Sequence, residues 1–94
     1  MPKVATIGSP VACGDSIAEG SSDVFIGGMP VALIGDKTTG HGCFPPSVII
    51  EGSGTVSINN KAVARVGHKI RTHCCNGSCH DSEISDGVAT VFVD

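Results

Sequence analysis

A short apolar phrase recurs along the chain, and its spacing constrains the fold more than any other feature of the sequence. The copies are residues 31–36 (Val-Ala-Leu-Ile-Gly-Asp), residues 63–68 (Val-Ala-Arg-Val-Gly-His) and, more loosely, residues 4–9 (Val-Ala-Thr-Ile-Gly-Ser). The match extends backwards, because residues 19–30 lie over residues 51–62 at a constant offset of 32, and a third copy of this segment begins at Asp86. A fixed period of this length indicates that one supersecondary unit is laid down repeatedly.

Each unit predicts a β-hairpin. Residues 24–26 and 56–58 are β-prone, and two-residue turns, Gly27-Gly28 and Asn59-Asn60, separate them from the apolar phrase. Gly-Gly and Asn-Asn tolerate the positive φ that a type I′ turn demands. Pro30 has no backbone N–H, which suits the start or edge of a return strand. Because no run of ten residues has helical apolar spacing, we expect at most one helical turn and an all-β fold.

The composition limits how such a fold can be stabilised. With 94 residues, 13 Gly, three Phe and neither Trp nor Tyr, the chain predicts a single domain over residues 1–94 with a thin core of Val, Ile and Ala. A core of this kind is marginal alone, so we expect a metal, disulfides or a large partner to supplement it.

Charge and hydropathy exclude two classes of partner. The net charge is −3 and no basic cluster is present, so a nucleic-acid binder is not expected. No segment approaches the roughly 20 apolar residues of a membrane span, so stable membrane insertion is not expected either. The first residues do not form a signal peptide, and we therefore expect synthesis in the cytoplasm and, if the protein is exported, transport by another machine.

Cysteine and histidine carry the chemistry of the sequence, and nearly all of them fall between the repeated hairpins. Counted from the residue after the glycine of each phrase, Cys13 comes four residues later, and His41 and His73 come five later. If the units surround a pseudo-threefold axis, these side chains converge, and His80 can fold back from the longest loop as a fourth ligand. Zn²⁺ suits three His and one Cys, with Zn–N of about 2.0 to 2.1 Å and Zn–S of about 2.3 Å.

A local site competes with this distributed one. His73, Cys75, Cys79 and His80 would form a Cys₂His₂ set without the other loops, in which Cys75 or Cys79 replaces Cys13 as the thiolate. We favour the distributed set, because a clip that closes several long loops removes more chain entropy than one that closes a single short loop.

The remaining side chains of this kind have simpler interpretations. Five Cys could form two disulfides with one left over, but nothing in the sequence directs the chain to an oxidising compartment. Cys43 and Cys74 are therefore interpreted as small buried apolar residues. His68 takes the place of Asp36 in the previous copy and is interpreted as a turn residue.

Taken together, the units resemble a known family. Residues 31–36 and 62–67 look like the Pro-Ala-Ala-Arg signature, and Glu-Gly-Ser followed by Val-Phe-Ile-Gly-Gly or Val-Ser-Ile-Asn-Asn looks like the rest of its unit. The chain is similar along essentially its whole length to the PAAR-repeat proteins, which cap the membrane-piercing spike of type VI secretion systems and related contractile phage tails. His68 departs from the pattern, because the signature usually has Asp there.

The resemblance implies a fold and a metal site. It implies one PAAR-repeat domain that forms a small pseudo-threefold β-cone of hairpins, with irregular loops converging on one structural Zn²⁺ at the tip. The ligands carried over by position are Cys13, His41, His73 and His80. Residues 40–46 would form a rigid loop on the flank of the cone.

The resemblance also implies a partner. One chain would sit on the C-terminal end of a trimeric β-helical spike, VgrG-like or from a phage, and would be delivered with it outside the cell or into a target cell. The strand edges of such a spike seek further strands, and three similar hairpins can match them by main-chain hydrogen bonds. The residues expected to face the spike are Val24, Phe25, Ile26, Val56, Ile58, Val91, Phe92 and Val93.

The sequence also allows two other functions to be considered. Asp81 or Glu83 could be a general base beside a catalytic zinc, but a site with four protein ligands has no open position, so we do not expect an enzyme. A small zinc-stapled adaptor that binds another protein inside the cell is the alternative function.

Overall fold

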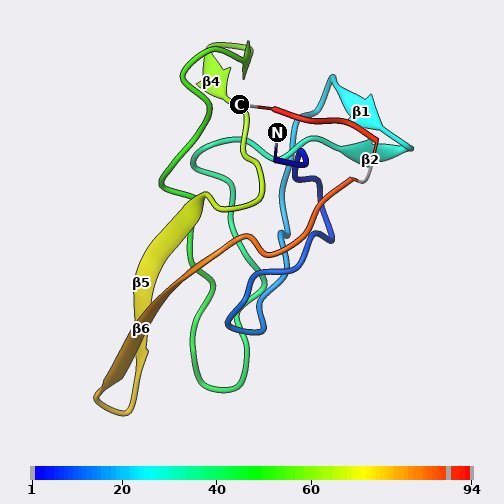
Figure 1. The fold of residues 1–94 in the computed structure, drawn as a ribbon. Coiled ribbons are helices and arrows are strands. Elements are labelled where there is room, and N and C mark those ends of the chain that lie inside the picture. The colour runs from blue at the N-terminus through cyan, green and yellow to red at the C-terminus, as the bar shows by residue number, and fades with distance from the viewer. Residues whose placement is uncertain (1, 89, 94) are drawn as a thin grey trace.

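Three antiparallel β-hairpins form the regular part of the computed structural model, which describes residues 2–88 and 90–93. They pair β1 (Phe25–Ile26) with β2 (Met29–Pro30), β3 (Ser57–Ile58) with β4 (Lys61–Ala62), and β5 (Lys69–Cys75) with β6 (Ser78–Glu83) (Figure 1). Within the described ranges no helix forms, and accordingly none is long and apolar enough to cross a membrane. The all-β prediction is confirmed.

The turns of the first two hairpins have the predicted backbone. Gly27 and Gly28 have φ of 59° and 83°, and Asn59 and Asn60 have φ of 53° and 67°. Positive φ at both central positions is what a type I′ turn requires, and Asn is among the few residues with a side chain that accept it. The return strands begin directly after these turns, as the sequence predicts.

Segments from the two ends of the chain together build a third unit of the same kind. The Val4 N–H donates to the Val91 carbonyl at 2.9 Å, just as Val31 donates to Val24 at 3.1 Å and Val63 to Val56 at 3.0 Å. Lys3 and Phe92 face each other in an antiparallel bridge, and Figure 1 shows both termini beside the short hairpins. The loose copy at residues 4–9 and the copy that begins at Asp86 are therefore two halves of one unit; Ala89, within the latter, lies outside the described residues.

A ring of three alanines defines the pseudo-threefold axis. The N–H of Ala5 donates to the carbonyl of Ala64 at 3.0 Å, that of Ala64 to Ala32 at 2.9 Å, and that of Ala32 to Ala5 at 2.9 Å. All three side chains are fully buried, at 0% exposure. Three backbones meet here at hydrogen-bonding distance, so only a small side chain fits, and this explains the second position of the repeated phrase.

Close packing also explains the glycine of the Glu-Gly-Ser segment and its counterpart in the third copy. A Cβ at Gly52 would lie 2.4 Å from the Cβ of Ala62, and one at Gly87 would lie 2.3 Å from the carbonyl oxygen of Val4. Each of these glycines thus lets the segment that precedes a hairpin lie directly against the return strand of its unit.

Aliphatic side chains form a thin core in two clusters along the axis. One cluster holds Ala5, Val11, Ile17, Ala32, Ile49, Ala64, Ile70 and Ile84. The other, closer to the short hairpins, holds Val4, Val31, Leu33, Val63 and Val93. The molecule is elongated, with extents of 37, 24 and 22 Å.

The segment after the last full copy differs from expectation. It was predicted to be an irregular loop, but β5 and β6 form the longest hairpin, which projects away from the short hairpins (Figure 1). Asn76 and Gly77 make its turn, with φ of 50° and 81°. Asn-Gly is the strongest short hairpin signal in a sequence, and it was present at these positions.

Candidate metal centre

The structure brings together the four side chains that the sequence singled out as metal ligands. One ligand atom from each of Cys13, His41, His73 and His80 lies within 4.8 Å of the others. The Cys13 Sγ is 3.9 Å from the His73 Nε2 and 4.0 Å from the His41 Nδ1, and the Nε2 atoms of His73 and His80 are 2.7 Å apart. These four side chains lie close enough to bind a metal ion.

Strand register places two of the four. His73 on β5 and His80 on β6 are directly opposite each other in the hairpin. Directly paired residues share one face of a sheet, so both imidazoles point the same way. His80 therefore reaches the group because of its register, and not because an irregular loop folds back, as the sequence analysis supposed.

Hydrogen bonds orient the histidines from outside. The Nδ1 of His73 donates to the Pro45 carbonyl at 2.8 Å, which leaves its Nε2 lone pair free for a metal. The Nδ1 of His41 contacts an oxygen of Asp15. Such outer partners fix the tautomer and the direction of metal-binding imidazoles.

Asp15 is a supporting residue that the sequence analysis missed. Its side chain is 1% exposed, and its second oxygen accepts hydrogen bonds from the Thr38 hydroxyl at 2.5 Å and the Gly40 N–H at 3.2 Å. Burial raises the pKa of Asp15, but the hydrogen bonds from His41 and Thr38 and the nearby imidazoles outweigh it and hold the pKa below 3.8. No sequence signal pointed to Asp15, since its partners lie more than 20 residues away.

An aromatic ring covers the group. The centroid of Phe44 lies 4.1 Å from that of His80 and 5.0 Å from those of His41 and His73. Residues 40–46 thus supply both a ligand and an apolar cover, which reduces the access of water to the imidazoles.

Four cysteines lie in pairs, and this corrects their interpretation. Cys43 pairs with Cys75 and Cys74 with Cys79 as disulfides, with Cα–Cα distances of 5.6 and 4.0 Å. Cys43 and Cys74 are exposed, so describing them as buried apolar residues was wrong. Cys13 is the free cysteine of the chain.

Side-chain alternation explains why the local Cys₂His₂ set does not form. Successive residues of a strand point to opposite faces, so Cys74 and Cys79 lie on the face away from His73 and His80. Cys75 is on the histidine face but is joined to Cys43. Cys13 is thus the thiol in the group, and neither Cys75 nor Cys79 replaces it.

The structure confirms His68 as a turn residue. Its Nδ1 accepts the Arg65 N–H at 3.1 Å, as the Asp36 carboxylate accepts the Leu33 N–H at 2.8 Å and the Ser9 hydroxyl the Thr6 N–H at 3.0 Å. An accepting nitrogen must be unprotonated. Burial, followed by the Arg65 charge, lowers the pKa of His68 from its ordinary 6.5.

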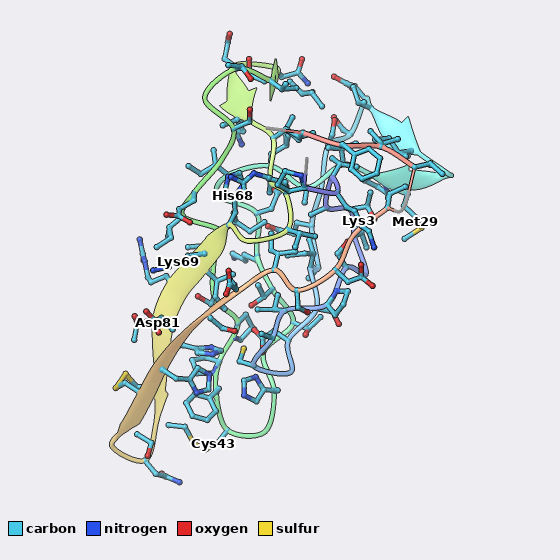
Figure 2. The ribbon with its side chains drawn as sticks, in the orientation of Figure 1. Lys3, Met29, Cys43, His68, Lys69 and Asp81 are labelled. Atoms are coloured by element: carbon cyan, nitrogen blue, oxygen red, sulfur yellow. A yellow bond between two sulfur atoms is a disulfide. The ribbon has the colours of Figure 1, made fainter. Side chains whose placement is uncertain are left out.

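The side chains expected to face a partner divide by exposure. Val24, Val56, Phe25 (53% exposed) and Phe92 (48% exposed) are open to solvent, and exposed Met29 joins them without having been predicted. Figure 2 shows Met29 at the end of the molecule opposite Cys43. The other four pack inward: Ile26, Ile58 and Val91 are partly covered by the core, and Val93 is buried in it.

Repeated hairpins around an axis, with a cluster of ligands at one end, define a class of small structural β-proteins built from internal repeats. Residues 2–44 match the family profile described as PAAR motif, a span that holds Cys13 and His41. This match supports a relationship of the chain to the PAAR-repeat proteins, a family of structural spike-tip proteins associated with type VI secretion and phage tails. No curated protein matches the chain.

Proposed function

We propose that this protein caps and sharpens the trimeric β-helical spike of a contractile injection machine, either a type VI secretion system or a phage tail, and helps it to pierce the target envelope. The observation that carries the proposal is the alanine ring. A single chain with three equivalent units around an axis can meet a trimer symmetrically, one chain for each spike. The chain would be made in the cytoplasm, assembled on the spike, and delivered with it.

The short hairpins supply a suitable docking face. Exposed apolar side chains occur on all three units: Val24, Phe25 and Met29 on the first, Val56 on the second and Phe92 on the third. β1 and β3 each pair with one strand, so their outer edges can accept another. Strand addition would provide affinity through the main chain, and the apolar side chains would exclude water.

We further propose that the ligand group holds one structural Zn²⁺ per chain. The donor set fits zinc, because a thiolate and three imidazoles satisfy its tetrahedral preference without a water ligand. The ion would join the Cys13 loop, the loop at residues 40–46 and the β5–β6 hairpin into one rigid end. A closed set of this kind supports a structural role.

Binding to a spike tests this proposal. The purified chain is titrated with a soluble trimer that contains the C-terminal end of a β-helical spike, and mass and affinity are measured by light scattering and calorimetry. We expect one chain per trimer. Phe25→Asp and Phe92→Asp should each weaken binding at least about tenfold, since each places a charge in a desolvated apolar contact.

Ile50→Asp is the matched control. Ile50 is exposed to a similar degree but lies beside the start of β5, where its N–H bonds the Lys69 carbonyl, and we expect it to leave binding unchanged. Equal losses for all three variants would contradict the assigned face. A chain that binds no spike trimer would contradict the function and favour the intracellular adaptor.

A further inference from the structure

The two cysteine pairs repeat the connections that a metal would make. Cys43 and Cys75 each lie two residues after a ligand, His41 and His73, and so join the same loop to the same strand. Cys74 and Cys79 occupy the rung next to the one formed by His73 and His80 and join the same two strands. Two of the connections that the metal would make, between residues 40–46 and β5 and between β5 and β6, thus have a covalent counterpart beside them, whereas those to the Cys13 loop have none.

We propose that these four cysteines form a second closure of the tip, which operates independently of the metal and forms when the protein leaves a reducing compartment. In the cytosol thiols are kept reduced, so the metal alone would hold this end. On exposure to an oxidant, Cys43 would join Cys75 and Cys74 would join Cys79.

The chemistry is ordinary thiol–disulfide exchange with a small-molecule disulfide such as oxidised glutathione. A cysteine thiolate attacks one sulfur of the oxidant and releases one reduced glutathione thiolate. The second cysteine thiolate then attacks the mixed disulfide and releases the other. The protons lost by the two cysteine thiols end on the two released glutathione thiolates, so each protein pair transfers two electrons and two protons to the oxidant, which is reduced to two thiols.

Exposure separates the paired cysteines from the ligand thiol. Cys43, Cys74 and Cys79 are exposed and Cys75 is half-buried, so an oxidant can reach at least one member of each pair. Cys13 is half-buried against the His41 and His73 rings and has no disulfide partner. The structure therefore assigns one cysteine to the metal and four to oxidation.

The main consequence concerns release of the metal. Separation of residues 40–46 from the β5–β6 hairpin would break the site, because His41 lies on one and His73 on the other. The Cys43–Cys75 bond holds these segments together two residues from both ligands. The Cys74–Cys79 bond joins strands that their own turn already holds together, and it closes a separation of 5 residues compared with 32 for the other pair. Protection of the metal should therefore come mainly from Cys43–Cys75.

The test compares the full chain, loaded with Zn²⁺, in its reduced state and after oxidation with a glutathione buffer. Mass spectrometry after thiol alkylation counts the free cysteines, and a colorimetric chelator follows zinc release. We expect one free cysteine after oxidation, zinc release slowed at least about tenfold, and a melting temperature raised by roughly 10 °C. Cys43→Ser/Cys75→Ser should remove most of the protection, and Cys74→Ser/Cys79→Ser should retain most of it.

Three results would overturn the proposal: five free cysteines after oxidation, equal zinc release from the two states, or protection that survives loss of Cys43 and Cys75. Because the release measurement rests on the proposed metal site, the zinc content of the reduced protein is measured first. If no zinc binds, the proposed metal site is wrong, and the cysteine pairs are then tested by melting temperature alone. A higher melting temperature after oxidation would support a closure by the disulfides, and an unchanged one would overturn it.

Discussion

The body around the alanine ring and the end around the ligand group are stabilised in different ways. In the body, backbone hydrogen bonds repeat three times and two aliphatic clusters fill the axis. Around the ligand group, His73 and Asp15 are buried polar side chains, and the connections are a cluster of ligand atoms and two disulfides. The body is held by contacts within the chain alone, whereas the closure proposed for the ligand end would depend on a metal and on redox conditions.

Substitution of a ring alanine should have the largest effect. Ala32→Leu adds three carbons where three backbones meet, and we expect a loss of about 3 kcal/mol in the free energy of unfolding, or failure to fold. Ala18→Leu, at an exposed position, is the control and should change stability little. Denaturant titration measures both. A tolerated Ala32→Leu would show that the ring does not determine the stability of the body.

Metal removal should affect the ligand end much more than the body. In the reduced protein, chelation should speed hydrogen exchange of amides in residues 40–46 and 69–83 by about tenfold or more, because the ligands no longer join them. The amides of Ala5, Ala32 and Ala64 should keep their protection. Exchange that rises equally in both regions would mean that they unfold as one unit.

A smaller effect is expected from substitution of Asp15, whose carboxylate contacts the His41 imidazole. Asp15→Asn keeps the shape but weakens the hydrogen bond that orients the imidazole, and zinc affinity should fall by about 10- to 100-fold. Asp81→Asn removes an exposed carboxylate next to His80 and should have little effect. Competition with a zinc chelator measures both affinities. Equal losses would point to general electrostatic attraction instead of orientation of His41.

Substitution of His68, which lies in the body, should have the smallest effect, a change in how stability depends on pH. Because the pKa of His68 is lowered in the folded protein, the unfolded chain takes up its proton first. Its contribution is therefore complete above about pH 6.5 and is lost as the pH falls from there through the folded pKa. In His68→Asp, which restores the acceptor of Asp36, this loss should be absent, so the difference in stability between variant and parent should change over this pH range. Arg65 and Glu51 are common to both proteins, as are the metal ligands, so the comparison isolates His68. An identical pH profile for the two would contradict the assignment.

Much of the fold could be predicted because repetition makes its elements visible in sequence. The offset of 32 residues aligned both short hairpins, and the Gly-Gly and Asn-Asn pairs located their turns. The grouping of Cys13, His41 and His73 followed from the same alignment, since equivalent loop positions lie near one another in the structure. The β5–β6 hairpin was missed because it has no counterpart in the other units, although Asn76-Gly77 marked its turn.

The rest depended on contacts that spacing does not reveal. The disulfides follow from which face of β5 each cysteine occupies, and that requires the strand itself. Asp15 meets Thr38 and His41 only after the loops have come together. The same step decides that Val93 is buried while Phe92 is exposed, an alternation that only the pairing with residues 2–4 establishes.

The third unit is assembled from both ends of the chain, so hydrogen bonds connect the first and last segments of the backbone to each other. Hydrogen bonds run from the Val4 N–H to the Val91 carbonyl and from the Val93 N–H to the Pro2 carbonyl. Neither end can therefore separate from the body without breaking the unit that it shares with the other end. Tension between the two ends would load these bonds first.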